Sequence, residues 1–216
     1  MSSLTLSYWH ESAADDAAPA QLRTRNISAT VLTATLTIPA PPARLFADWE
    51  REMAQQLNLQ AGDVESLPLA RARMRWPEYT ACVQAVGDWT RQIGMPDVLA
   101  DSEVALMACR GARYHHDGER YGGSAFCNLF LSDDKGLDLH FPALALRIRL
   151  VRGMAVIFDT AQPHAVIPRD GKGFSVSDFP PERDCSQVFL TWELPLDDAS
   201  VAQILNISFD QSHSST

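Results

Sequence analysis

The sequence predicts a mainly β protein with helices in its N-terminal half, which is an α+β fold whose C-terminal half forms a β-sandwich or barrel. From Glu103 to Leu196, short apolar runs alternate with turn residues, and this pattern is typical of many short strands packed in two layers. Before this region, apolar side chains recur at helical spacing in two stretches, which favours two amphipathic helices.

The N-terminal half is expected to contain one strand and these two helices. Residues 27–38 mix β-branched side chains with Ala, Ser and Thr, which indicates a strand. Residues 43–57 place apolar side chains on one helix face, and two prolines stand before them, where a helix tolerates proline. A second helix is expected from Pro77 to about Ile93, and a glycine follows it. Residues 58–75 fit no single pattern.

The C-terminal half is expected to supply most of the strands. Its apolar runs cover residues 103–109, 126–132, 137–141, 144–151, 154–158, 164–168 and 186–194. We predict a single domain over residues 1–216, in which residues 1–100 support a β core at 101–196. Residues 197–216 are expected to form a C-terminal tail that begins with a short helix.

Charge and cysteine content narrow the possible partners and compartment. The chain has 18 Lys and Arg against 27 Asp and Glu, a formal net charge of -9, which disfavours binding to the phosphates of nucleic acid and to an anionic membrane. The N-terminus lacks the regions of a signal peptide. The four cysteines include no C-x-x-C pair. We therefore expect a cytoplasmic protein with reduced thiols and with neither nucleic-acid nor membrane partners.

The histidines of the C-terminal half suggest a metal site. His115 and Asp117 form a His-x-Asp motif, and because residues i and i+2 of an extended chain share a face, His116 should point away. His164 lies at the start of a later apolar run, whereas His140 is expected to be structural or pocket-lining. Two imidazoles and one carboxylate can occupy one face of an octahedral ion and leave three positions open, as in non-haem Fe(II) oxygenases.

Three stretches of the sequence resemble the double-stranded β-helix (jelly-roll or cupin-like) core of the Fe(II)- and 2-oxoglutarate-dependent oxygenases, most closely the prolyl-hydroxylase-like branch. They are residues 108–117, 153–168 and 188–192. The resemblance implies a dioxygenase that hydroxylates an unactivated C–H bond and releases succinate and CO2. It implies Fe(II), 2-oxoglutarate and O2 as cofactor and co-substrates, with ascorbate as an optional reductant. The implied metal ligands are His115, Asp117 and His164.

The resemblance also implies a basic side chain for the far carboxylate of 2-oxoglutarate, because a guanidinium binds a carboxylate through two parallel hydrogen bonds. In the family this residue usually begins the closing strand. We assign Arg183 to this role, on the expectation that residues 170–182 are an inserted loop. If the closing strand is aligned on Trp192 instead, Ser186 falls at the arginine position. Substitutes for Arg183 are Arg110, Arg147 and Arg149.

The substrate and the reaction class stay open at this point. The resemblance suggests a protein side chain, a peptide or a small amino-acid-like molecule as substrate, and residues 170–182 are a candidate lid over the site. One alternative is a cupin-type metalloenzyme that needs no 2-oxoglutarate, although cupins usually carry His-x-His and here His115 and His116 are adjacent. The other is a non-catalytic β-barrel that binds a small ligand or a protein partner.

Overall fold

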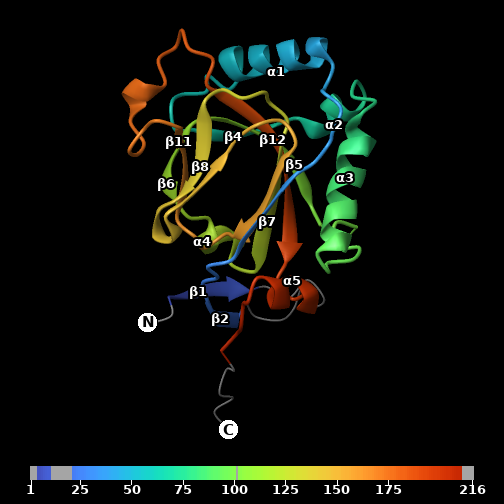
Figure 1. The fold of residues 1–216 in the computed structure, drawn as a ribbon, viewed down its shortest axis with the longest axis vertical. Helices are drawn as coiled ribbons and strands as arrows, with labels where there is room; N and C mark the ends of the chain where they lie inside the picture. The colour runs from blue at the N-terminus through green and yellow to red at the C-terminus, as the bar shows by residue number, and fades with distance from the viewer. Residues whose placement is uncertain (1–3, 11–20, 101, 211–216) are drawn as a thin grey trace.

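The computed structural model describes residues 4–10, 21–100 and 102–210 (Figure 1). The helices are α1 (Ala43–Gln55), α2 (Leu69–Arg73), α3 (Tyr79–Gln92), α4 (Gly118–Tyr121) and α5 (Ala199–Ile204). The strands are β1 (Thr5–His10), β2 (Gln21–Asn26), β3 (Val31–Thr35), β4 (Val64–Leu67), β5 (Val104–Arg110), β6 (Ala112–His115), β7 (Ser124–Phe130), β8 (Leu137–Phe141), β9 (Leu146–Arg149), β10 (Met154–Asp159), β11 (His164–Pro168) and β12 (Ser186–Pro195). Among the described helices, none has the length and apolar composition needed to cross a membrane.

Two antiparallel sheets form the centre of the molecule. The larger has the strand order β3-β10-β7-β12-β5-β4, and the smaller has the order β6-β11-β8-β9. Their facing sides share one apolar core, to which the larger sheet contributes Phe130 and Phe189 and the smaller contributes Phe141 and Ile148. This arrangement confirms the predicted mainly β, jelly-roll fold with helices at the N-terminal side.

The outer face of the larger sheet is covered by helices, as Figure 1 shows for α1 and α3. A second apolar core lies there and includes Trp49 of α1 and Val86 of α3. Strand β12 separates the two cores because its side chains alternate between the two faces of the sheet. Leu190 and Trp192 belong to the outer core, whereas Phe189 belongs to the core between the sheets.

The expected elements match the structure where the apolar pattern is long or clearly bounded. The two long helices are present, and β8 and β11 have the bounds of their apolar runs. The segment 58–75, which had no clear pattern, contains β4 and α2. The short helix of the predicted tail is α5, and residues 211–216 lie outside the described part of the chain.

The pairing of β1 with β2 was not expected. Only one strand, at residues 27–38, is predicted for the N-terminal half, but β2 begins at Gln21 and pairs antiparallel with β1. Residues 11–20, between the two strands, lie outside the described residues. The sequence of β2, QLRTRN, has almost no apolar side chains, so the usual alternation of a half-buried strand is missing. Its backbone pairing and the burial of one arginine, Arg25, define the strand instead.

Arg25 forms a buried ion pair that ties this strand to the larger sheet. Its Nη1 and Nη2 each donate to the carboxylate of Asp159 at 2.8 Å, and neither side chain is exposed to solvent. The backbone amides of Ser28 and Ala161 donate to the same carboxylate at 2.8 and 2.9 Å. A buried charge is tolerated only when it is paired and hydrogen-bonded, and here both conditions are met.

We predict that Arg25→Met lowers the free energy of unfolding by about 3–5 kcal/mol, because it leaves the buried carboxylate of Asp159 without its counter-ion. Urea titration followed by circular dichroism measures the change. The matched control is Arg23→Met, which removes the more exposed pair with Asp197 and should cost at most about 1 kcal/mol. Equal losses for the two variants would contradict this account of the buried pair.

Candidate metal centre

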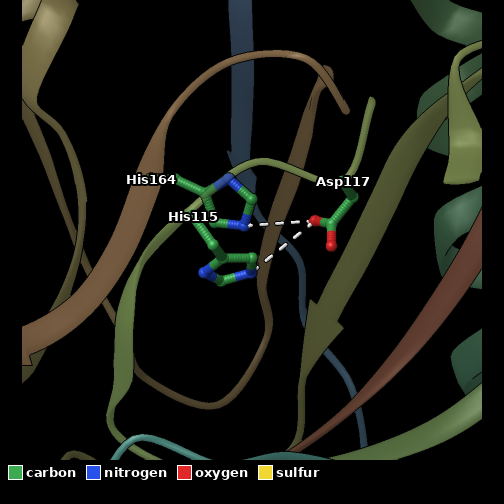
Figure 2. A group of neighbouring side chains, drawn as sticks. All are labelled: His115, Asp117 and His164. Carbon is green, nitrogen blue, oxygen red and sulfur yellow. Dashed lines mark ion pairs between the residues drawn. The ribbon is translucent and has the colours of Figure 1, made fainter. Parts of the chain in front are cut away.

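Three side chains that the sequence selected lie together in the structure, as Figure 2 shows. Asp117 Oδ2 is 3.7 Å from His115 Nε2 and 3.6 Å from His164 Nε2. One ligand atom from each residue lies within 4.8 Å of the others. The three atoms therefore surround a space into which a single cation fits.

Strand pairing and one turn bring these residues together. Strand β6 runs antiparallel to β11, and His115 lies directly opposite His164, with ring centroids 4.4 Å apart. Asp117 follows two residues after β6 ends, in a turn with φ -102° and ψ 3°. Its backbone amide donates to the carbonyl of Thr160 at 2.7 Å. The prediction that His115 and Asp117 share a face because the chain is extended is wrong in its reason, since Asp117 reaches the site through this turn.

Backbone carbonyls orient both imidazoles. His115 Nδ1 donates to the carbonyl of Arg113 at 2.6 Å, and His164 Nδ1 donates to the carbonyl of Gln162 at 2.9 Å. A proton held on Nδ1 leaves the lone pair on Nε2, which is the nitrogen that faces Asp117 in both cases. Metal-binding histidines usually donate such a hydrogen bond from the ring nitrogen that does not bind the metal.

The surroundings keep the deeper imidazole uncharged. His164 packs against Phe158 and Phe141, with ring centroids 4.9 and 6.0 Å away. Burial lowers the pKa of His164 to about 3, and the neighbouring His115 adds to that effect. Burial also raises the pKa of the Asp117 carboxyl, against the opposing effect of His115. A bound cation would compensate the burial of this carboxylate.

The donor set fits a divalent transition metal with open coordination positions. Within the described residues, no other group of three or more His, Cys, Asp or Glu side chains offers ligand atoms this close together. His116 is exposed and belongs to no such group. His140 instead contacts the hydroxyl of Tyr114 through Nδ1 at 2.7 Å. A structural zinc site would need a fourth protein ligand, whereas two nitrogens and one oxygen suit Fe(II).

The predicted anchor Arg183 lies elsewhere. It lines a cavity of about 1060 Å³ between α1 and the outer face of the larger sheet, together with Arg110, and none of the three clustered residues lines this cavity. Of the substitutes, Arg147 donates to the backbone carbonyls of residues 169 and 171, and Arg149 pairs with Asp134. The role of Arg183 stays a prediction, which an experiment described below tests.

The candidate lid also lies away from the cluster. Residues 170–182 follow β11 at its Pro168 end, whereas His164 begins that strand. Figure 1 shows this orange segment at the end of the sheets opposite to α4, and α4 directly follows Asp117. The segment borders the outer cavity, which residues 176–184 help to line, except for Asp178.

The residues that fix the loop between β10 and β11 were not predicted from the sequence. Thr160 accepts the amide of Asp117, and its own hydroxyl donates to the carbonyls of Tyr121 and Ser124 at 2.8 and 2.9 Å. Asp159 begins this loop and is bound by Arg25. The only signal in the sequence is that three polar residues, Asp159, Thr160 and Gln162, lie just before His164. Nothing in the sequence pairs Asp159 with the distant Arg25.

Comparisons with known proteins found matches among solved structures. No protein-family model and no curated protein matches the chain. Among solved structures, a prolyl-4-hydroxylase of Pseudomonas putida shares 17% identity over 76% of this chain and 91% of that chain, with a TM-score of 0.42. The viral collagen prolyl hydroxylase of Paramecium Bursaria Chlorella virus-1 in complex with 2-oxoglutarate shares 8% identity over 76% and 94%, with a TM-score of 0.44. EvdO2 of Micromonospora carbonacea var. aurantiaca, complexed with 2-oxoglutarate, shares 13% identity over 76% and 86%, with a TM-score of 0.45.

We predict that Asp117→Asn weakens Mn(II) binding by roughly 100-fold or more, because loss of even an outer hydrogen-bond partner of a metal site costs about 10- to 100-fold. The substitution keeps the side-chain shape and removes the charge. Isothermal titration calorimetry under anaerobic conditions measures the affinity. His116→Ala, which changes the adjacent exposed histidine, should stay within about twofold of the wild type. Equal affinities for Asp117→Asn and the wild type would refute ligation by Asp117.

Proposed function

We propose that this protein is a non-haem Fe(II)- and 2-oxoglutarate-dependent dioxygenase that hydroxylates an unactivated C–H bond. The observation that supports the proposal best is the cluster of His115, Asp117 and His164, with its ligand atoms within 4.8 Å of one another. Such a set fills one face of an octahedral ion and leaves room for a chelating co-substrate and O2. Fe(II) with 2-oxoglutarate and O2 supplies the oxidant for hydroxylation, and succinate and CO2 are released.

The residues of the chain prepare the site for this chemistry. His115 and His164 each turn Nε2 toward Asp117, and that residue supplies the one carboxylate of the set, so a divalent cation bound there would keep a net positive charge toward an acidic co-substrate. Phe158 and Phe141 border His164 on the side of the core between the sheets. These apolar rings exclude water from that side, which limits unproductive reactions of the bound metal.

We propose a peptide side chain or an amino-acid-like molecule as the substrate. Charged groups of both signs interact around α4, next to Asp117: Tyr121 interacts with Arg120 and Glu193, and burial raises the pKa of both Tyr121 and Glu193. Arg120 also lies over the Tyr121 ring at 5.1 Å. Charged groups of both signs beside the cluster suit a substrate that carries an amino and a carboxyl function or their amides.

We also propose a reducing compartment, the cytoplasm, and no nucleic-acid or membrane partner. All four cysteines are buried and none forms a disulfide, which suits a protein that is never exposed to oxidising conditions. The net charge of -9 opposes attraction to phosphate groups.

Anaerobic addition of Fe(II) and 2-oxoglutarate to the purified protein should produce the weak visible charge-transfer band of a metal-chelated 2-oxo acid. On admission of O2, we expect succinate to form, with faster formation when the correct peptide or amino acid is present. Asp117→Ala should lose succinate formation because it removes a metal ligand. Unchanged succinate formation in that variant would refute the assignment.

Two other outcomes identify the alternative functions. Substrate turnover that needs Fe(II) but not 2-oxoglutarate would indicate a cupin-type metalloenzyme. Failure of the folded protein to bind Fe(II), Mn(II) or Ni(II) under anaerobic reconstitution would indicate a non-catalytic ligand-binding protein.

A further inference from the structure

Two polar side chains lie without partners between the two sheets. Asn128 of β7 and Thr191 of β12 are 7% and 8% exposed, and neither Asn128 Oδ1 nor Thr191 Oγ1 has a hydrogen-bond partner. Both face the inter-sheet core, because they alternate with Leu129 and Leu190, which belong to the outer core. Buried polar atoms normally have a partner, so these two indicate a site for a polar group.

The two residues form one site close to the metal centre. Asn128 and Thr191 are direct cross-strand partners. Phe126 of β7 lies one inward-facing position nearer to the metal ligands and pairs with Phe158 of β10. The ring centroids of Phe158 and His164 are 4.9 Å apart. Two residues along a strand span roughly 7 Å. A five-carbon acid bound to the metal at one end reaches about this far into the core.

No Lys or Arg side chain of the described residues is buried in that space. Of the Lys and Arg residues that the structure describes, Arg25 is the only fully buried one, and it binds Asp159. Arg183 lines the cavity of about 1060 Å³, which none of the three clustered residues lines. Ser186 and Val188, which alternate with the inward-facing Phe189, line the same outer cavity. The Arg183 guanidinium lies beside Gly136, which directly precedes β8. Because Leu137 of β8 pairs with Pro168, this position is at the far end of β11 from His164.

We propose, on the basis of the proposed function, that Asn128 and Thr191 bind the far carboxylate of 2-oxoglutarate through uncharged hydrogen bonds, in place of an arginine. The Thr191 hydroxyl donates one hydrogen bond and the Asn128 amide nitrogen another, after a flip of the amide, whose two ends are nearly isosteric. Hydrogen bonds to a charged acceptor are stronger than those between neutral groups. The single net positive charge of a divalent ion held by Asp117 is neutralised by the carboxylate next to the keto group, so these two hydrogen bonds carry the recognition of the far carboxylate.

A third inward polar residue is not part of this site. Gln187 is fully buried and both of its side-chain amide atoms lack partners. It lies four residues before Thr191 on β12, beyond the pair formed by Phe130 and Phe189. An acid that extends only to Thr191 does not reach it, and this separation provides a control.

Calorimetric titration of the Mn(II)-loaded protein with two acids tests the proposal. 2-Oxoglutarate and 2-oxopentanoate have the same carbon chain, and only the first has the far carboxylate. We expect Thr191→Val and Asn128→Leu each to weaken 2-oxoglutarate binding roughly tenfold or more, which corresponds to about 1.4 kcal/mol. Binding of 2-oxopentanoate and of Mn(II) itself should change less than about twofold in both variants.

Matched variants serve as controls. Thr191→Ser keeps the hydroxyl, Arg183→Ala removes the predicted basic anchor, and Gln187→Leu removes the deeper amide, and all three should bind 2-oxoglutarate as the wild type does. Thermal unfolding without ligand checks that the variants fold. Thr191→Val and Asn128→Leu should not lower the melting temperature, because each replaces an unpartnered buried polar group by an apolar one.

Each remaining outcome overturns a definite statement. The proposed pair would be refuted if Arg183→Ala or Gln187→Leu selectively weakened 2-oxoglutarate binding while Thr191→Val and Asn128→Leu did not. The far carboxylate would then be assigned to Arg183 or Gln187. Equal weakening of both acids by Thr191→Val and Asn128→Leu would also refute the pair as a carboxylate site. If the wild type binds Mn(II) but neither acid, the proposed function itself fails.

Discussion

The antiparallel pairing of β6 with β11 is the constraint on which the candidate site depends. It sets His115 directly opposite His164, although the two residues are far apart in the chain. The connection between β10 and β11 then completes the arrangement, because Thr160 fixes the backbone of Asp117 and the carbonyl of Gln162 orients His164. A short loop therefore controls one ligand through the backbone and another through its ring.

The buried ion pair of Arg25 with Asp159 anchors this loop from outside the central sheets. Asp159 ends β10, and its carboxylate receives two hydrogen bonds from Arg25 and two from backbone amides. Ion pairs of this kind do not add much net stability compared with apolar packing, but they are costly to break. In this molecule the pair fixes the position of the loop that leads to His164. Its main role is therefore to position this loop.

Much of the architecture and the three candidate ligands could be predicted from the sequence. Apolar runs bounded by turn residues mark β8 and β11, and helical spacing marks α1 and α3, because burial of one face imposes those periods. The three candidate ligands could be selected because His-x-Asp followed by a histidine at the start of an apolar run is a rare combination. Strands with little apolar content, such as β2, gave no such signal.

The anchor residue shows where sequence reasoning reaches its limit. Alternation along β12 tells which residues share a face, but the sequence does not say which face is inward. Aligning the strand on Trp192 selects Ser186, yet Trp192 packs in the outer core and Ser186 lines the outer cavity. The inward set contains Thr191 and Gln187, and nothing in the sequence distinguishes Thr191 until its cross-strand partner Asn128 is known.

A crystal structure of the protein with Mn(II) would show whether these three side chains bind one ion, because anomalous scattering locates the ion without reference to the protein chain. We expect one strong peak at about 2 Å from His115 Nε2, His164 Nε2 and an Asp117 carboxylate oxygen, with the remaining coordination positions on the side away from these residues. A peak bound by other residues, or an ion that any of the three side chains fails to reach, would contradict it.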